Sequence, residues 1–463
     1  MRRFVLVLAL VVALGAAACG EDGSGTRVVL VDYSSDEYAS SAFFNYPAKL
    51  DATPGQTIVF QQEWTGEPHT VTGGSIVNDA IGKGKDWIDF FESFDALAAE
   101  GGAELPNPED PGDATFADFA AALKSATDKA GAKKVIDAYN GVRASGVPLP
   151  DLDNPPAVGF TDFVTQVEEE SDEAFSGIPL AFDDEDEVAQ NVGQPCYKAT
   201  GTFRDDASKP CTKAQQEQPA FDGKQTIYNS GLIRYEGPDG NTFEMELADD
   251  IKPGTYFFYC AVHGLGQTTE LEVKPKGSKV ESRVSVGRRA RDEAEKTLLP
   301  LDKVYRSAAK TNAITVDGEK IEGPFAGLVA EGADHALLNE FLPRKITAKV
   351  NEPITWKAFG SDHTISFDVP DYFPILEFDT KDGVRFNARL GRPAGGAPDI
   401  PEQDGEGVLK IDGGTYDGTG FWSSGLFGAE PYAEYTVRIS KPGTYPYACL
   451  IHPPMIGQIV VTR

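Results

Sequence analysis

Histidine and cysteine are scarce in this chain, whose 463 residues include five of each. Chemistry that needs many imidazoles, such as a trinuclear copper cluster, is therefore excluded. Basic residues are also in the minority, with 42 Lys and Arg against 72 Asp and Glu and a formal charge of −30. Because phosphate binding needs a basic face, a nucleic-acid partner is excluded. The charge suits an exported protein that meets a basic partner protein.

Long apolar runs are absent except at the N-terminus. Arg2 and Arg3 precede an almost wholly apolar run from Phe4 to Leu14. This run is shorter than the ~20 residues that a membrane-spanning helix needs, and small residues follow it. We therefore predict a signal peptide over residues 1–18.

The run Ala16-Ala17-Ala18-Cys19 resembles a bacterial lipobox, in which the cysteine is lipidated and becomes the mature N-terminus. Ala16 stands where a large aliphatic residue is usual, so an ordinary cleaved signal peptide is the alternative. Residues 19–27 have the composition of a flexible tether. We expect an extracytoplasmic lipoprotein, anchored to the cell membrane through Cys19, in the periplasm or at the cell surface.

Several short segments occur twice, in the same order, which indicates two copies of one domain. The pairs, first copy before second, are His69-Thr70-Val71 and His363-Thr364-Ile365, Ser230-Gly231-Leu232 and Ser424-Gly425-Leu426, Lys252–Tyr256 and Lys441–Tyr445, Cys260 and Cys449, and His263 and His452. In both copies the Cys follows the Tyr by four residues, and the His follows the Cys by three. We expect domain one at 28–274, a linker at 275–312 and domain two at 313–463.

The repeated segments alternate apolar and polar residues and are rich in Val, Ile, Thr, Tyr and Phe, with turn signals between them. This pattern predicts a mainly β fold of two antiparallel sandwiches. The first copy also carries an insertion at about 75–225. Helical spacing over Asp86–Ala99 and Phe116–Tyr139 predicts a helical subdomain there, with Thr115 and Thr161 as candidate helix N-caps.

The second copy offers a set of metal-binding side chains, His363, Cys449, His452 and Met455. Two imidazoles, one thiolate and a weak axial thioether are the ligands of a type 1 (blue) copper site. A single loop between two strands can present the Cys, the second His and the Met around one point, and His363 arrives from another strand. A packed β scaffold then restrains the ligands during oxidation and reduction.

The motif Cys449-x-x-His452-x-x-Met455, with His363 upstream, resembles that of the cupredoxins, such as plastocyanin, azurin and amicyanin. The resemblance covers about residues 28–74, 226–274, 313–369 and 421–463, and it implies two cupredoxin-like Greek-key β-sandwiches with one copper ion per domain. The helical insertion lies outside it.

The first copy keeps His69, Cys260 and His263 but departs from the pattern at the axial position. Counting from His263 aligns Gly266 with Met455, whereas counting back from the closing strand aligns Gln267. Because Gln serves as the axial ligand in some members of the family, the resemblance makes Gln267 the candidate. A metal-free first site is the alternative.

The remaining cysteines and histidine fall outside these sites. Cys196 and Cys211 can close a short loop as a disulfide in an oxidising compartment, which would add ~3 kcal/mol by the loop-closure model. His335 has no neighbouring candidate ligand in the sequence, and we expect an ordinary surface histidine.

Three functions fit two cupredoxin-like domains. The first is electron transfer with a redox partner protein, and the second is copper binding for delivery without redox traffic. The third is an enzyme, either a two-domain copper oxidase or a nitrite reductase. Those enzymes place a His beside the type 1 Cys, but Tyr259 and Ala261 flank Cys260, and Ala448 and Leu450 flank Cys449. No His-x-His pair occurs either, so we expect an electron carrier and not an enzyme.

Overall fold

The computed structural model describes residues 26–62, 67–99, 103, 105–106, 112–175, 219–233, 241–316, 318–330, 333, 336–360, 362–369, 376–379, 383–401, 407–428 and 431–463. The predicted signal peptide, the lipid site Cys19, the Cys196–Cys211 disulfide and His335 lie outside these residues. No helix within the described ranges combines the length and the apolar character that crossing a bilayer requires.

The first half folds into two sheets that enclose one apolar core. One sheet has the order β3-β1-β5-β8, and the other has the order β4-β10-β9-β6-β7. The strands are β1 (Arg27–Val31), β3 (Asn45–Tyr46), β4 (Lys49–Ala52), β5 (Thr57–Gln62), β6 (Thr72–Gly73), β7 (Tyr228–Asn229), β8 (Thr242–Glu246), β9 (Gly254–Cys260) and β10 (Gly264–Val273). Alternate residues of β5 and β10 are buried, as expected for strands with one face on a core. Ile58, Phe60, Phe258 and Leu271 meet in that core.

The second half repeats this arrangement. Its sheets have the orders β2-β14-β13-β16-β22-β20 and β15-β24-β23-β17-β21. The strands are β2 (Ser40–Ala42), β13 (Phe325–Leu328), β14 (Ala336–Leu342), β15 (Lys345–Lys349), β16 (Ile354–Ala358), β17 (Ser366–Phe367), β20 (Leu409–Tyr416), β21 (Trp422–Ser423), β22 (Ala433–Ile439), β23 (Gly443–Ala448) and β24 (Ile456–Thr462). Outside the sandwich lie the hairpins β11 (Ala313–Val316)–β12 (Glu319–Glu322) and β18 (Leu376–Asp379)–β19 (Gly383–Phe386), and the short helix α7 (Ala388–Gly391).

The two halves share a strand order. The order β4-β10-β9-β6-β7 in the first half corresponds strand for strand to β15-β24-β23-β17-β21 in the second. Leu271 on β10 pairs with Leu50 on β4, and Ile459 on β24 pairs with Ile346 on β15, so the two closing strands also share their register. The predicted mainly β fold is therefore confirmed. The expectation of antiparallel sheets is wrong in part, because β4 pairs with β10, and β15 with β24, in parallel.

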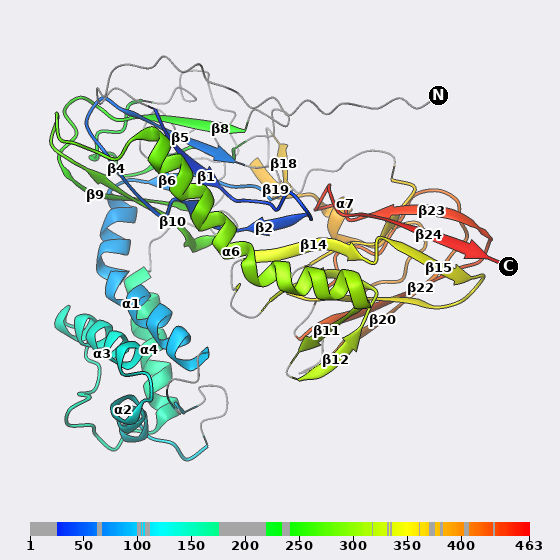
Figure 1. The fold of residues 1–463 in the computed structure, drawn as a ribbon, viewed down its shortest axis with the longest axis horizontal. Helices are drawn as coiled ribbons and strands as arrows, with labels where there is room; N and C mark the ends of the chain where they lie inside the picture. The colour runs from blue at the N-terminus through cyan, green and yellow to red at the C-terminus, as the bar shows by residue number, and fades with distance from the viewer. Residues whose placement is uncertain are drawn as a thin grey trace.

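The insertion in the first half is helical, as predicted. Its helices are α1 (Ser75–Ala99), α2 (Phe116–Ser125), α3 (Lys129–Ala144) and α4 (Phe160–Phe175), and they project from the first sandwich with a core of their own (Figure 1). Thr115 caps α2 in a reciprocal capping box with Asp118, which confirms that prediction. The prediction that Thr161 caps a helix is wrong, because α4 already begins at Phe160. The predicted helix Phe116–Tyr139 is two helices, since Asp128 caps the start of α3.

The two halves interlock. Strand β2 belongs to the first half of the chain but pairs with β14, so it forms an edge of the second half's sheet (Figure 1). The segment expected as a linker is largely the helix α6 (Arg283–Thr311), which contacts β1 and β3 of the first half and β11 and β14 of the second. Its buried face includes Ala290, Ala294 and Leu298, so α6 joins the two sandwiches through a shared core.

Candidate metal centres

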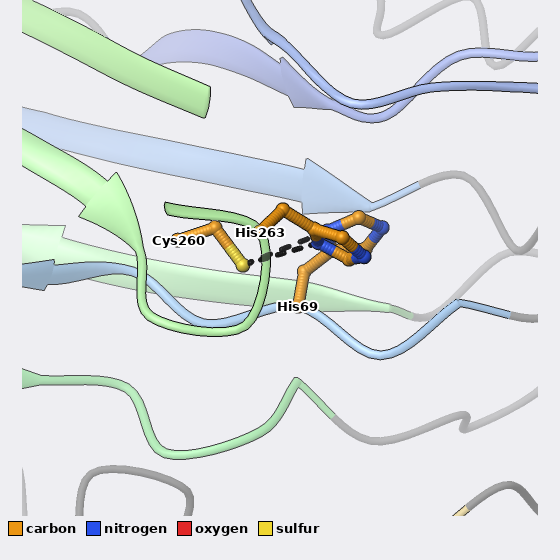
Figure 2. A group of neighbouring side chains, drawn as sticks. All are labelled: His69, Cys260 and His263. Atoms are coloured by element: carbon orange, nitrogen blue, oxygen red, sulfur yellow. Dashed lines mark hydrogen bonds between the residues drawn. The ribbon is translucent and has the colours of Figure 1, made fainter. Parts of the chain in front are cut away.

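The first candidate centre lies at one end of the first sandwich. Figure 2 shows the side chains of His69, Cys260 and His263 converging from different segments. His69 lies shortly before β6, Cys260 ends β9, and His263 lies between β9 and β10. Cys260 Sγ is 3.8 Å from His69 Nδ1 and 3.5 Å from His263 Nδ1. The geometry therefore gathers the predicted thiol and both predicted imidazoles around one point.

The second centre has the same construction at the equivalent place. Cys449 Sγ is 3.9 Å from His363 Nδ1 and 3.6 Å from His452 Nδ1. The two Nδ1 atoms are 3.2 Å apart, and all three residues are buried. In both centres it is Nδ1 of each imidazole that faces the sulfur.

Matching hydrogen bonds hold the two centres in shape. Thr70 N donates to Cys260 Sγ and Thr364 N donates to Cys449 Sγ, both at 3.4 Å. In both halves the hydroxyl of the same Thr accepts from the backbone after the Cys, at 2.8 Å. The repeated serines, Ser230 and Ser424, accept from the backbone two residues after each upstream His, also at 2.8 Å. These bonds explain why the Ser-Gly-Leu and His-Thr segments recur together.

Gln267 lies beside the first centre. Its side chain is fully buried on β10, and its Oε1 is 3.0 Å from His69 Nδ1, the atom that faces Cys260. Its Nε2 donates to Phe44 O at 3.5 Å, which turns the amide oxygen toward the ligands. The pairing of β9 with β10 is irregular between Gly264 and Thr268, so the inserted residue is absorbed there. The structure thus places the side-chain oxygen of Gln267 against one of the predicted ligands.

Met455 is fully buried in the second half's core. Its N donates to His452 O at 2.8 Å, and its O accepts from Cys449 N at 3.0 Å. A single tight turn therefore carries Cys449, His452 and Met455, as the sequence predicts.

Sequence reasoning missed the groups that contact the outer nitrogens of these imidazoles. Asp32 Oδ2 is 3.1 Å from His69 Nε2. Glu67 Oε1 is 3.0 Å from His452 Nε2, and its Oε2 is 3.8 Å from His263 Nε2. Carboxylates in this position fix the tautomer and the orientation of a metal-ligating imidazole. They leave Nδ1 as the nitrogen that faces the cysteine.

The cysteines are held in the state that binds metal. Burial alone favours the neutral thiol, but the imidazoles of His263 and His69 outweigh it and lower the pKa of Cys260 well below its usual value. The imidazoles of His363 and His452 do the same for the pKa of Cys449. Because the thiolate is the form that ligates metals, both sites favour metal binding.

The pKa values of the four histidines shift in different directions. Burial disfavours the imidazolium, yet Cys260 and Glu67 raise the pKa of His263 to about 10, and Cys449 and Glu67 raise that of His452 to about 10. Asp32 and Cys260 raise the pKa of His69 to about 9. Burial lowers the pKa of His363, and Cys449 only partly offsets this. A metal must displace any protons on Nδ1, so its binding is linked to proton release.

The donor set of each centre fits copper. A thiolate and two imidazoles suit both Cu(I) and Cu(II), and a thioether or amide oxygen supplies a weak axial contact. In each centre the ligand atoms of the three residues lie within 4.8 Å of one another. Among the described residues, these are the two groups of three or more His, Cys, Asp or Glu side chains close enough to hold a metal ion.

No protein-family model and no curated protein matches this chain. Solved structures that match include amicyanin. A reduced amicyanin variant has 15% identity, covers 27% of this chain and 73% of its own, and gives a TM-score of 0.13. An oxidised variant has 14% identity, the same coverage and a TM-score of 0.13. Similarity at TM-scores this low supports no conclusion about the two centres, so their interpretation rests on their own geometry.

Proposed function

We propose that this chain is an exported protein that transfers electrons, with one type 1 copper ion in each sandwich. His69, Cys260, His263 and Gln267 would hold one ion, and His363, Cys449, His452 and Met455 the other. A copper ion bound in this way accepts and releases one electron. The observation that carries the proposal is that both halves direct a buried cysteine sulfur and two Nδ1 atoms at one point.

The rigid placement of the predicted ligands favours electron transfer over the other functions. The ligands lie on or beside strands, and hydrogen bonds from Thr70 and Thr364 to the sulfurs restrain them further. Preorganised ligands move little when the charge of the metal changes, which keeps the exchange of electrons fast. In this proposal Cys19 tethers the protein to the membrane, and a basic redox protein meets its acidic surface.

Copper delivery is the alternative function, and burial argues against it. A protein that hands over a metal must let the acceptor reach the ligands. The side chains of His452 and His69 are fully buried, and those of His363 and Cys449 are nearly so. The most exposed described ligand, His263, is 15% exposed. An enzymatic role is not proposed, because neither cysteine has the adjacent histidine that would connect it to a catalytic copper.

A visible spectrum and a redox titration of the copper-loaded full chain test the proposal. We expect intense blue absorption and a reversible one-electron couple for each centre. Colourless Cu(I) that passes readily to a chelator would favour delivery instead. The absence of any blue species after loading with Cu(II) would refute the proposal.

The two centres should have different potentials. Gln267 offers an amide oxygen, which is a harder donor than the thioether of Met455 and interacts better with Cu(II). We therefore expect the first centre to have the lower potential and Gln267→Met to raise it by at least about 59 mV, which corresponds to a tenfold change for one electron. Titration in a Cys449→Ser background isolates the first centre.

The reciprocal variant supplies the control for that titration. Met455→Gln in a Cys260→Ser background should lower the potential of the second centre. Equal potentials in the unmodified protein, with no shift in Gln267→Met, would show that Gln267 is not an axial ligand.

A further inference from the structure

A single carboxylate lies between the two centres. Glu67 Oε1 is 3.0 Å from His452 Nε2 in the second centre, and Glu67 Oε2 is 3.8 Å from His263 Nε2 in the first. Each of these imidazoles turns its other nitrogen, Nδ1, toward its own cysteine, at 3.6 and 3.5 Å. A continuous chain of contacts therefore runs from Cys260 through two imidazoles and Glu67 to Cys449.

The surroundings restrain Glu67 and its neighbour His263. Gln62, at the end of β5, donates from Nε2 to the backbone O of Glu67 at 2.8 Å. The ring of Phe43, which directly follows β2, stacks on His263 with centroids 4.5 Å apart and planes 15° apart. Because β2 is itself an edge strand of the second half's sheet, the same interlock that joins the halves sets the position of His263 against Glu67.

Exposure differs between the two ends of the chain of contacts. The side chain of His452 is 0% exposed, whereas those of His263 and Glu67 are 15% and 16% exposed. Solvent thus reaches the first centre's His263 but not the second centre's His452. The part of the contact chain that solvent reaches is the edge formed by His263 and Glu67.

We propose that Glu67 couples the two centres into one electron-sharing pair, so that the second centre exchanges electrons by way of His263, Glu67 and His452. This inference rests on the proposed electron-transfer function. In the step, one electron leaves Cu(I) in the first centre, which becomes Cu(II), and reduces Cu(II) in the second centre to Cu(I). No bond is made or broken, and the proton between Glu67 and His452 stays where it is.

Glu67 acts through the two histidines, so it is a positioning residue. Hydrogen bonding to its carboxylate fixes His452 with Nδ1 toward the copper and shortens the gap across the interface. The lower potential expected of the first centre gives the step its direction. Electrons would enter at the exposed edge and come to rest in the buried centre.

The test is a pulse reduction of the full chain loaded with copper in both centres and supplied with less than one electron per molecule. We expect a second kinetic phase, independent of protein concentration, in which the first centre's blue band recovers as the second bleaches. Glu67→Ala should keep both bands and slow this phase by at least about tenfold, the usual scale for losing an outer contact of a metal ligand. Glu67→Gln should fall between the two, because its amide oxygen still accepts from His452.

Asp32→Asn is the matched control, since Asp32 is likewise a carboxylate on the outer nitrogen of a ligand imidazole, that of His69 in the first centre. Its rate should stay closer to that of the unmodified protein than the rate of Glu67→Ala does. A second readout needs no electron transfer. In the diamagnetic Cu(I) form, ¹⁵N NMR should show a protected Nε2–H on His452 that Glu67→Ala loses.

Two results would overturn the inference. One is an unchanged intramolecular rate in Glu67→Ala, and the other is a second phase whose rate rises with protein concentration. If Glu67→Ala loses a blue band through misfolding, Glu67→Gln decides, and an unchanged rate there refutes the coupling. Absence of any blue band in the unmodified protein would refute the proposed function itself and the coupling with it.

Discussion

Cys449→Ser should abolish the blue band of the second centre and leave that of the first intact. The band depends on the thiolate, and the serine hydroxyl is a harder donor that stays protonated. The fold should persist, because a serine oxygen can accept the hydrogen bond that Thr364 N now donates to the sulfur. Visible absorption and copper content of the loaded protein measure the first effect, and circular dichroism measures the second.

The reciprocal change, Cys260→Ser, should remove the first centre's band alone. The double variant should be colourless while remaining folded. If the double variant kept full copper and colour, neither cysteine would be a ligand and the whole assignment would fail.

Gly327→Ala should disrupt the second centre although it replaces none of the predicted ligands. Gly327, on β13, has φ +78, and a Cβ built there would lie 1.9 Å from His363 Nε2. His363 is 1% exposed, so its ring has little room to retreat. The ring must turn away from Cys449, and the second centre should lose its blue band. Absorption in a Cys260→Ser background, where the second centre is the one that remains, measures this.

Gly420→Ala is the control for that substitution. Gly420 has φ +74, and no atom lies within 4 Å of its built Cβ. Both variants carry the left-handed backbone cost of roughly 1–2 kcal/mol, so thermal unfolding should shift in both. Colour should be lost in Gly327→Ala alone. A second centre with normal colour in Gly327→Ala would show that His363 does not depend on this close approach.

The sequence predicts the interior of each half well, and the reason is local. Cys449, His452 and Met455 lie in one short turn, so their spacing alone brings them together. Gln267 could be chosen over Gly266 because the closing strands β10 and β24 share a register that alignment detects. Repetition then linked His69 and His363 to their cysteines across long separations.

What the sequence does not predict is how the halves meet. Glu67 contacts His452 across 385 positions, and no periodicity or motif connects the two. The sequence does not predict the roles of Asp32 and Gly327 either, because these roles depend on which strand lies beside each histidine. A repeat describes the copies but not the interface between them. The pairing of β2 with β14 could not be anticipated for the same reason.

That pairing makes the two halves inseparable as folding units. A fragment that starts after α6 would lack β2 and would present the bare edge of β14, with its unpaired backbone groups open to any passing strand. A fragment that ends before α6 would leave Leu30 and Tyr46 without the helix that covers them. Each half therefore depends on an element that lies outside it in the chain. We therefore expect both sandwiches to unfold in one cooperative transition. A fragment that contains one sandwich alone should aggregate rather than fold.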